Sequence, residues 1–278
     1  MHHEFTTVLT IAGSDGSGGA GIQADLKAFA ACGCYGLSVI TAVTAQNTMG
    51  VRDYLAIPAS FIRTQFETIA DDIRIDAVKI GMLGSTDSAQ TVTGLLGGLR
   101  GVPVVLDTVM RSSSGKSLFP EENRASMSRL FPLATLITPN LPEAAWLTGR
   151  ETHPSGDGEI EEMALALHRQ GASSVLVKGG HGEGSECRDC LLHEGEFHWF
   201  SNRKIVTRNT HGTGCTLSST IASELAKGTG MVDAVGNAIV YTRSALEAGA
   251  SWRLGHGNGP LQHFPQSCFT RRGDRPME

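Results

Sequence analysis

TVLTIA, residues 7–12, is a short and mostly apolar run whose surroundings decide how the rest of the chain is interpreted. A glycine-rich segment and a helical pattern near residues 20–32 follow it directly. Further apolar runs lie at 37–45, 76–80, 103–107, 134–138 and 174–178. Most of these runs are rich in Val, Ile and Leu without strict polar alternation, which predicts strands buried on both faces of a sheet.

Segments with helical periodicity separate these strands. Regular alternation of strand and helix predicts an α/β fold with a mostly parallel sheet. The expected helices lie near residues 20–32, 58–71, 87–99, 121–131, 142–148 and 158–170.

The last third of the chain has a different pattern. Residues 189–206 indicate short strands and turns, and two helices are expected near 213–227 and 231–249. No internal repeat or low-complexity linker interrupts the chain. We therefore expect a single domain over residues 1–260 and a C-terminal tail over 261–278.

The composition argues against several classes of protein. The 278 residues carry a formal net charge of −5, and no basic stripe of the kind that binds nucleic acid stands out. The N-terminus lacks the features of a secretory signal, and no apolar run approaches the roughly 20 residues that span a bilayer. Six cysteines at irregular positions are not typical of a disulfide scaffold. We expect a cytoplasmic protein without nucleic-acid or membrane partners.

The first glycine-rich loop, residues 13–21 (GSDGSGGAG), contains a dinucleotide-binding pattern. Gly16, Gly18 and Gly21 satisfy it, which would indicate an NAD-binding oxidoreductase. That pattern also requires an acid at the end of the second strand to hold the ribose. The second strand ends in AQN at residues 45–47, without an acid. A tight turn is therefore the better interpretation, and NAD binding is a distant alternative.

The second glycine-rich loop, residues 209–216 (NTHGTGCT), leads into an amphipathic helix. Gly212 and Gly214 would let backbone amides turn inward, where they and the positive end of the helix dipole can bind an anion. In a phosphoryl-transfer enzyme, that anion would be the phosphoryl group in transit.

Cys215 lies in the first turn of that helix. Helix N-termini lower the pKa of a thiol from about 8.5, so we expect a favoured thiolate that could accept a proton from a substrate hydroxyl. A small side chain that only fills space is the equally weighted alternative from position alone.

Seven segments follow one another along the chain, namely residues 10–29, VITAVTAQNT (39–48), AVKIGML (77–83), VVLDTVM (104–110), LITPNLPEAA (136–145), VLVKGGH (175–181) and NTHGTGCTLSS (209–219). In this order they resemble the hydroxymethylpyrimidine/phosphomethylpyrimidine kinases of thiamine biosynthesis, which are ribokinase-like enzymes. The resemblance implies a ribokinase-like three-layer sandwich with a central, mostly parallel sheet flanked by helices. It also implies a stand-alone kinase, commonly a homodimer, since no thiamine phosphate synthase region follows the motifs.

The activity implied by this resemblance uses ATP and Mg²⁺. It phosphorylates 4-amino-5-hydroxymethyl-2-methylpyrimidine, and then the resulting monophosphate to the diphosphate. No residue in the sequence distinguishes one step from two.

The resemblance assigns a substrate pocket to five positions. Gln46 would face the pyrimidine, because its amide offers a donor and an acceptor to a ring nitrogen and an exocyclic amine. Gly13, Asp25, Met82 and Val109 would complete the pocket, the last two as apolar walls. Asp25 has a second interpretation, as a compensating charge near a helix N-terminus.

Nucleotide and metal roles fall on four further positions by the same resemblance. Asp107 and Glu143 would associate with Mg²⁺, partly through its waters. Lys178 would meet the nucleotide phosphates as a point charge, and Thr210 would also contact ATP. Asp107 and Lys178 end predicted strands, at the edge where α/β folds bind their ligands.

The catalytic assignment combines Gly212, Thr213 and Gly214 with Cys215. In the wider superfamily, the residue that ends this loop is usually an aspartate that acts as a base. Here the loop ends in cysteine, as it does in the pyrimidine kinases. The substitution favours Cys215 as the base or its equivalent.

Pyridoxal kinases of the same superfamily are the main alternative. Some resemble the pyrimidine kinases closely and carry a second cysteine in a lid that follows a motif like DTVM, residues 107–110. Residues 111–115 (RSSSG) contain no cysteine here, which argues against a two-cysteine mechanism but leaves slow pyridoxal phosphorylation open. Their serine and glycine content suits a mobile lid.

A zinc-binding module is a remote alternative. Structural zinc sites commonly use two well-spaced ligand pairs, and the spacing of the available residues is irregular. Those residues are Cys32, Cys34, His181, Cys187, Cys190 and His193.

Overall fold

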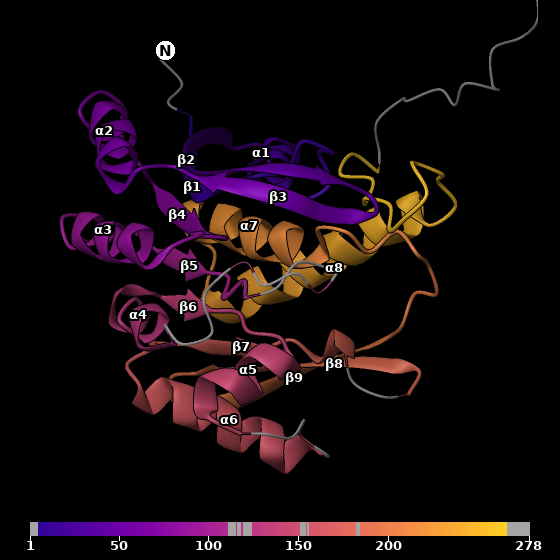
Figure 1. Cartoon of the computed structure of the whole chain (residues 1–278). Coiled ribbons are helices and arrows are strands. Elements are labelled where there is room, and N and C mark those ends of the chain that lie inside the picture. The colour runs from indigo at the N-terminus through magenta and orange to yellow at the C-terminus, as the bar shows by residue number, and fades with distance from the viewer. Residues whose placement is uncertain are drawn as a thin grey trace, which may run out of the picture.

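A nine-stranded sheet forms the centre of the molecule (Figure 1). The computed structural model describes residues 5–110, 115, 118, 124–150, 154, 156–181 and 184–265. The elements used below are β1 (Thr7–Ser14), α1 (Gly21–Ala31), β2 (Tyr35–Asn47), β3 (Gly50–Ala56), α2 (Ala59–Ala70), β4 (Ala77–Ile80), α3 (Thr86–Leu96), β5 (Val104–Leu106), α4 (Arg124–Ser128), β6 (Leu136–Ile137), α5 (Leu141–Thr148), α6 (Asp157–Arg169), β7 (Val175–Val177), β8 (Glu186–His193), β9 (Glu196–Arg203), α7 (Thr213–Ala226) and α8 (Met231–Gly249).

The strands follow the order β3-β2-β1-β4-β5-β6-β7-β8-β9. All neighbours from β2 to β7 are parallel, which confirms the predicted mostly parallel sheet. β3 pairs antiparallel with β2 at one edge, and β8 and β9 add an antiparallel hairpin at the other.

β3 is not among the strands expected from sequence. Arg52 and Asp53 interrupt its apolar pattern, and its side chains are only half-buried or exposed. It forms an edge of the sheet and pairs with β2 alone. Its place therefore depends on the long β2, which continues to Asn47 and turns back on itself.

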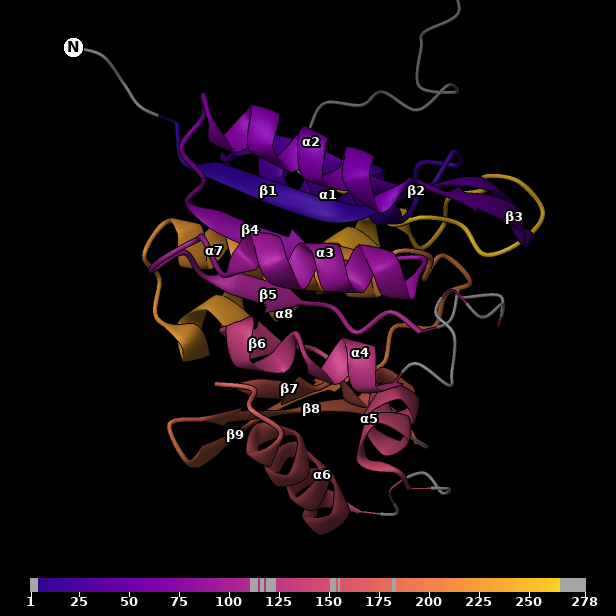
Figure 2. The same ribbon diagram turned by 60° about the vertical axis from the view of Figure 1, so that its left-hand side comes forward.

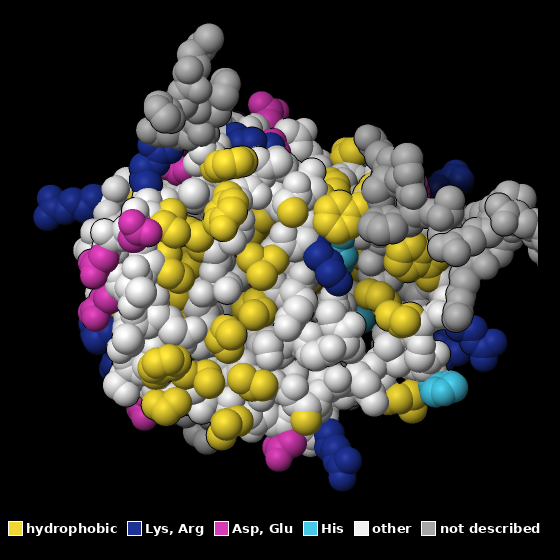
Figure 3. Space-filling view, turned by 90° about the horizontal axis from the view of Figure 1, so that it is seen from above, with side chains coloured by type: hydrophobic (Ala, Val, Ile, Leu, Met, Phe, Trp, Pro, Cys, Tyr) yellow, Lys and Arg dark blue, Asp and Glu magenta, His cyan; other side chains and the backbone are white. Residues whose placement is uncertain are grey.

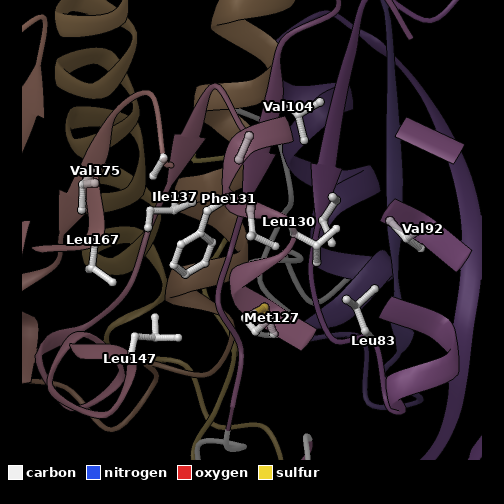
Figure 4. Close-up of a cluster of buried hydrophobic side chains, with 14 of the residues drawn as sticks. Leu83, Val92, Val104, Met127, Leu130, Phe131, Ile137, Leu147, Leu167 and Val175 are labelled. Carbon is white, nitrogen blue, oxygen red and sulfur yellow. The ribbon is translucent and has the colours of Figure 1, made fainter. Parts of the chain in front are cut away.

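Side chains of the central strands alternate between two hydrophobic clusters. In β5, Val104 and Leu106 belong to one cluster and Val105 to the other. Because successive strand residues point to opposite faces, apolar residues at every position fill both. Figure 4 shows part of the first cluster, in which Phe131 packs near Ile137.

Helices cover both faces of the sheet and complete a three-layer sandwich. α2, α3, α4, α5 and α6 supply the first cluster, whereas α1, α7 and α8 supply the second. Figure 2 shows α3 and α6 in front of the sheet, with α7 and α8 behind it. This arrangement confirms the predicted fold class. Within the part of the chain that the structure describes, no helix is both long enough and apolar enough to cross a lipid bilayer.

The start of the expected C-terminal tail is packed into the fold. Leu261 and His263 are buried, and the His263 ring lies 3.0 Å from the Thr216 hydroxyl of α7. Tyr241 of α8 donates a hydrogen bond to the His263 carbonyl. His263, just beyond residue 260, therefore contacts both α7 and α8.

Candidate active site

The carboxyl ends of the parallel strands open into a cavity of about 950 Å³. Ligands bind at this edge in open α/β sheets, because the loops there bring residues from different strands together. Apart from Asp25, every site residue expected from the sequence lines the cavity. These residues are Gly13, Gln46, Met82, Asp107, Val109, Glu143, Lys178, Thr210, Gly212, Thr213, Gly214 and Cys215.

The second glycine-rich loop forms the start of α7 at this cavity. Gly212 is the N-cap residue with φ of 86°, in the left-handed region that glycine tolerates. A Cβ at this position would lie only 1.8 Å from the Gly19 carbonyl oxygen, so the two glycine-rich loops pack directly on each other. No side chain caps α7. The amides of its first turn, which have no partner within the helix, can therefore serve a bound anion.

The Cys215 thiol is partly exposed at the cavity, but its ionisation differs from the expectation. Burial raises its pKa to about 11, and the carboxylates of Asp25 and Asp107 oppose the thiolate further. The Lys79 ammonium and the Gly21 amide act in the opposite direction without outweighing burial. The prediction of a lowered thiol pKa is therefore wrong for this structure, because burial outweighs the groups that favour the thiolate.

Lys178 and Asp107 form an ion pair beside this loop. Lys178 Nζ lies 2.9 Å from Asp107 Oδ1, and both side chains are largely buried. Thr138 also donates to Oδ1, and Ser218 of α7 lies 3.4 Å from Oδ2. Although burial opposes ionisation, the Lys178 ammonium keeps the pKa of Asp107 below its usual value. The pair thus places a fixed positive and a fixed negative charge at the cavity wall.

Glu143 is held by a capping box at the start of α5. The Glu143 amide donates to Asn140 Oδ1, and the Asn140 amide donates to Glu143 Oε2, each at 2.9 Å. Thr108 donates to the same carboxylate oxygen. Burial raises the pKa of Glu143 to about 7, and the neighbouring Asp107 charge adds to this effect, while Lys178 opposes it.

Asp107 and Glu143 are suited to a hydrated divalent cation. Carboxylate oxygens are the ligands that Mg²⁺ prefers, and Mg²⁺ usually keeps several waters. The buried Asp107 carboxylate and the half-buried Glu143 carboxylate repel each other, and a nearby cation would stabilise both. Among the described residues, no cluster of three or more His, Cys, Asp or Glu could enclose a metal by protein ligands alone.

The expected substrate wall comes from the ends of β1 and β2 and from the segments that follow β4 and β5. Gly13 is the last residue but one of β1, and a Cβ there would come within 3.1 Å of the Met82 sulfur. Met82 and Val109 supply apolar surface to the cavity, together with Leu118. Gln46 places its amide nitrogen 3.1 Å from Nε2 of His211.

Asp25 is a correction to the expected pocket. Its side chain is fully buried and receives the Lys79 ammonium at 2.8 and 2.9 Å. Thr10 and Ser219 donate to the same carboxylate. Because its oxygens are already satisfied, Asp25 supports the cavity floor and does not line it. Nor does it lie in the first turn of α1, where a charge would compensate the helix dipole.

Three charged or titratable residues at the site were not assigned roles from the sequence. Lys79 is a buried lysine in an otherwise apolar strand, and the Asp25 carboxylate raises its pKa against the effect of burial. Asp15 and His211 lie within the two glycine-rich loops and meet at 2.8 Å. A lysine inside the apolar run AVKI is a sequence signal, whereas the contact between the loops is visible only in the tertiary structure.

The first glycine-rich loop is not arranged for a dinucleotide. The amides of Ser17, Gly19 and Ala20 donate to the carboxylate of Asp15. A pyrophosphate would need such amides for itself. The Asp15 carboxylate therefore takes up the amides of this loop in place of a bound anion. This explains why the glycine pattern occurs without the ribose-binding acid.

The cysteines and histidines expected for a zinc module do not converge. Cys187 and Cys190 lie three residues apart on β8, so their side chains point to opposite faces. His193 bonds to the Ser174 hydroxyl. The serine-rich segment expected as a lid lies largely outside the described residues, since only Gly115 of residues 111–115 is described.

Comparisons with known proteins agree on one family. A family model described as phosphomethylpyrimidine kinase matches residues 15–262. A hydroxymethylpyrimidine/phosphomethylpyrimidine kinase from Escherichia coli is 46% identical over 258 residues, which cover 92% of this chain and 96% of the relative.

Solved structures give the same superfamily by shape. An ADP complex of Bacillus subtilis pyridoxal kinase is 34% identical with a TM-score of 0.84, and the match covers 94% of this chain and 98% of that one. A phosphomethylpyrimidine kinase from Clostridium difficile 630 is 40% identical with a TM-score of 0.76, over 86% of this chain and 99% of its own.

Proposed function

This chain belongs to the phosphomethylpyrimidine kinase family, and we propose that it transfers the γ-phosphoryl group of ATP to 4-amino-5-hydroxymethyl-2-methylpyrimidine and then to the resulting monophosphate. Both reactions serve thiamine synthesis. One observation carries the proposal, namely that Cys215, the start of α7 and the Lys178–Asp107 pair line a single cavity. A substrate hydroxyl, a migrating phosphoryl group and nucleotide phosphates can meet there.

In the first step, the hydroxymethyl oxygen attacks the γ-phosphorus while the bond to the β-phosphate oxygen breaks and ADP leaves. The hydroxyl proton passes to Cys215 Sγ as the phosphate ester forms, in the minor fraction of molecules whose thiol is ionised, since its pKa is about 11. The amides of Gly214 and Cys215 face the phosphoryl oxygens, and the charge of Lys178 offsets the negative charge that spreads over them. Thr210 contributes to the nucleotide side of the cavity.

In the second step, an oxygen of the monophosphate attacks the γ-phosphorus of a second ATP. An anhydride forms while the bond to the β-phosphate oxygen breaks and ADP leaves. The second pKa of a phosphate monoester is about 6, so at pH 8 the attacking group has already lost its protons. This step needs the same loop amides and Lys178, but it needs no base. The proposed role of Cys215 is therefore restricted to the first step.

Asp107 and Glu143 would hold Mg²⁺, mainly through its water molecules. Bound there, Mg²⁺ supplies positive charge to the β- and γ-phosphate oxygens. The chain's own contribution is to keep the two carboxylates in place through Thr138, Thr108 and Asn140.

The test is an acceptor assay on purified protein with Mg-ATP. Hydroxymethylpyrimidine, its monophosphate and pyridoxal are supplied separately, and ADP and phosphorylated product are both measured. We expect turnover of the two pyrimidines. Without pyrimidine turnover, the proposed substrate is wrong even if the protein hydrolyses ATP.

Pyridoxal kinase is the second candidate, favoured by the close fit to pyridoxal kinase structures from Bacillus subtilis and Staphylococcus aureus. The latter is described as a complex with pyridoxal. If pyridoxal alone releases ADP and yields product, the assignment moves to this activity within the same superfamily.

We also propose a single-domain homodimer located in the cytoplasm. A continuous nine-stranded sheet supports one domain. Large apolar side chains are exposed around β2 and β3, among them Val43, Met49 and Leu55, which is 70% exposed. Figure 3 shows hydrophobic side chains spread over the face seen from above. Light scattering should give twice the chain mass, and Leu55→Lys should reduce it.

A further inference from the structure

We propose that Asp15 and His211 fix the direction of the Gln46 amide, and so select a pyrimidine whose ring nitrogen accepts a hydrogen bond and whose adjacent exocyclic group donates one. The inference rests on the proposed function in one respect, that Gln46 faces the pyrimidine. It adds Asp15, His211 and Thr44 as residues that determine specificity through Gln46.

Asp15 is a carboxylate surrounded by donors. Its Oδ1 accepts hydrogen bonds from the Ser17 amide and hydroxyl at 2.8 and 2.7 Å. Its Oδ2 accepts from the amides of Gly19 and Ala20 at 3.1 and 2.8 Å. Burial alone would raise its pKa, yet the hydrogen bonds from His211 and Ser17 bring it to about 2. Asp15 is therefore ionised at neutral pH and can only accept hydrogen bonds.

His211 must then donate from Nε2. This atom lies 2.8 Å from Asp15 Oδ2, and both side chains are buried. A hydrogen bond between them requires a hydrogen on Nε2, whether the ring is neutral or cationic. The Asp15 carboxylate thus requires a His211 ring that carries a hydrogen on Nε2, and it does so without contacting the pyrimidine itself.

The hydrogen on His211 Nε2 matters because of the position of Gln46. One end of its amide lies 3.1 Å from His211 Nε2, and the other lies 3.4 Å from Thr44 Oγ1. The Thr44 hydroxyl donates to the Ser14 carbonyl at 2.7 Å, so its oxygen can only accept at the amide. With the Gln46 amide nitrogen toward His211, its N–H donors face the Nε2–H donor of the ring. At the other end, Gln46 Oε1 faces Thr44 Oγ1, and both of these oxygens are acceptors.

A half-turn of the amide corrects both mismatches. The oxygen and nitrogen of a glutamine side chain have nearly the same shape, so the hydrogen-bond network decides between them. With Oε1 toward His211, it shares the single Nε2 hydrogen with Asp15 Oδ2 in a three-centre hydrogen bond, and the amide nitrogen donates to Thr44 Oγ1. Asp15, His211 and Thr44 therefore all favour the same orientation.

This orientation fixes what remains for a ligand. One lone pair of Oε1, on the His211 side, and one N–H, on the Thr44 side, stay available at the cavity. An aminopyrimidine matches them with its exocyclic amine toward His211 and its ring nitrogen toward Thr44. Its 4-oxo analogue, 5-hydroxymethyl-2-methylpyrimidin-4(3H)-one, presents a carbonyl and a ring N–H and so reverses the pattern.

The experiment compares kcat/KM for the aminopyrimidine and its 4-oxo analogue. We expect the wild type to favour the amine by at least about 10²-fold, as sites with fixed hydrogen-bonding groups do. In His211→Met, the side chain has no hydrogen-bond donor for Gln46, so the Gln46 amide can turn. The ratio of kcat/KM for the aminopyrimidine to that for the 4-oxo analogue should then fall to within about tenfold. His211→Gln returns an N–H near the position of Nε2 and should recover most of the ratio. The dissociation constant for ATP, measured without pyrimidine, should stay within about threefold in both.

The outcomes separate the inference from the proposed function. No turnover of the aminopyrimidine by the wild type would mean that the proposed function fails. If His211→Met lowers kcat/KM for both compounds equally, or if His211→Gln behaves like it, the donor role is overturned and His211 only supports the loops.

A second pair of variants tests the other end of the amide. Thr44→Val removes the acceptor oxygen with little change of shape, and we expect the ratio to fall as it does in His211→Met. Thr44→Ser keeps the hydroxyl and should retain the preference. If His211→Met does not fold, this pair decides alone, and an unchanged ratio in Thr44→Val overturns the inference.

Discussion

Lys178 Nζ lies 2.9 Å from Asp107 Oδ1, although the two residues are 71 positions apart and follow strands that are not neighbours in the sheet. Asp107 follows β5 and Lys178 follows β7, with β6 between these strands, so the ion pair spans the carboxyl end of β6. A Cβ on Gly214 would lie 3.3 Å from this ammonium and 3.6 Å from Asp107 Oδ2. The start of α7 is thus seated directly on the ion pair.

Breaking this pair should cost stability as well as activity. Lys178→Met leaves the Asp107 charge largely buried without its partner, so the free energy of unfolding should fall by about 3 kcal/mol. Asp107→Asn added to it should recover about 1–3 kcal/mol in a double-mutant cycle, measured by urea denaturation. Phosphoryl transfer should remain at least about 10²-fold below wild type in both. Additive losses of stability would contradict the coupling.

Gly214→Ala should impair activity while leaving the fold intact. Gly214 has no positive φ, so alanine suits the helical backbone, but its methyl group would press against Lys178 Nζ. We expect kcat/KM for ATP to fall by about 10–100-fold, with little change in Tm. Gly156→Ala is the matched control, since, apart from its chain neighbours, no atom of the described residues lies within 4 Å of a Cβ there. Equal effects of the two variants would remove the steric argument.

Cys215→Ala should separate the two reactions. With hydroxymethylpyrimidine, kcat should fall by about 10²–10⁴-fold, the usual range for a lost general base. With the monophosphate at pH 8, where the acceptor is already ionised, the loss should stay within about tenfold. ATP binding by calorimetry should be near normal in both cases. An unchanged kcat for the first reaction would exclude Cys215 from the mechanism.

The raised pKa of Cys215 can be measured by alkylation. Because burial holds it at about 11, modification of this thiol by iodoacetamide should increase about tenfold per pH unit between pH 7 and 9. Lys79 is the main group that favours the thiolate, so Lys79→Met should slow the reaction. Peptide mass spectrometry distinguishes Cys215 from the other cysteines, and a rate that levels off below pH 8 would contradict the assigned pKa.

Binding of Mg²⁺ should depend on the ionisation of Glu143. Its pKa is raised to about 7, so the carboxylate is mostly protonated at pH 6 and mostly ionised at pH 8. The apparent affinity for Mg²⁺ in the presence of ADP should therefore increase by up to about tenfold over this interval. Glu143→Gln can keep the capping box and should bind weakly with no such pH dependence. The same slope in this variant would assign the titration to another group.

Asp15 should contribute stability that disappears in acid. Its folded-state pKa of about 2 lies below the ordinary value of 3.8, so its contribution is complete above about pH 5 and is lost as the pH falls toward 2. The difference in unfolding free energy between wild type and Asp15→Asn should shrink by about 2 kcal/mol over that range. A difference that does not vary with pH would mean that Asp15 gains nothing from its charge.

Local patterns were enough to identify most elements. Strands such as β5 and β7 are apolar at every position because both faces are buried, and this signal does not depend on the rest of the chain. β3 carries no such signal, since its partner β2 supplies the reason for its position. The burial of Leu261 is equally invisible locally.

The sequence by itself determined the fold class, the two glycine-rich loops and twelve residues of the cavity wall, because strand periodicity and motif order are properties of short segments. Only the tertiary structure decided the electrostatics and the contacts between distant loops. Burial raises the pKa of Cys215 although this residue lies at the start of a helix. The ion pair with Lys79 holds Asp25 away from the cavity wall. Asp15 and His211 meet across 196 positions. Desolvation and hydrogen bonding depend on neighbours that only the folded chain brings together.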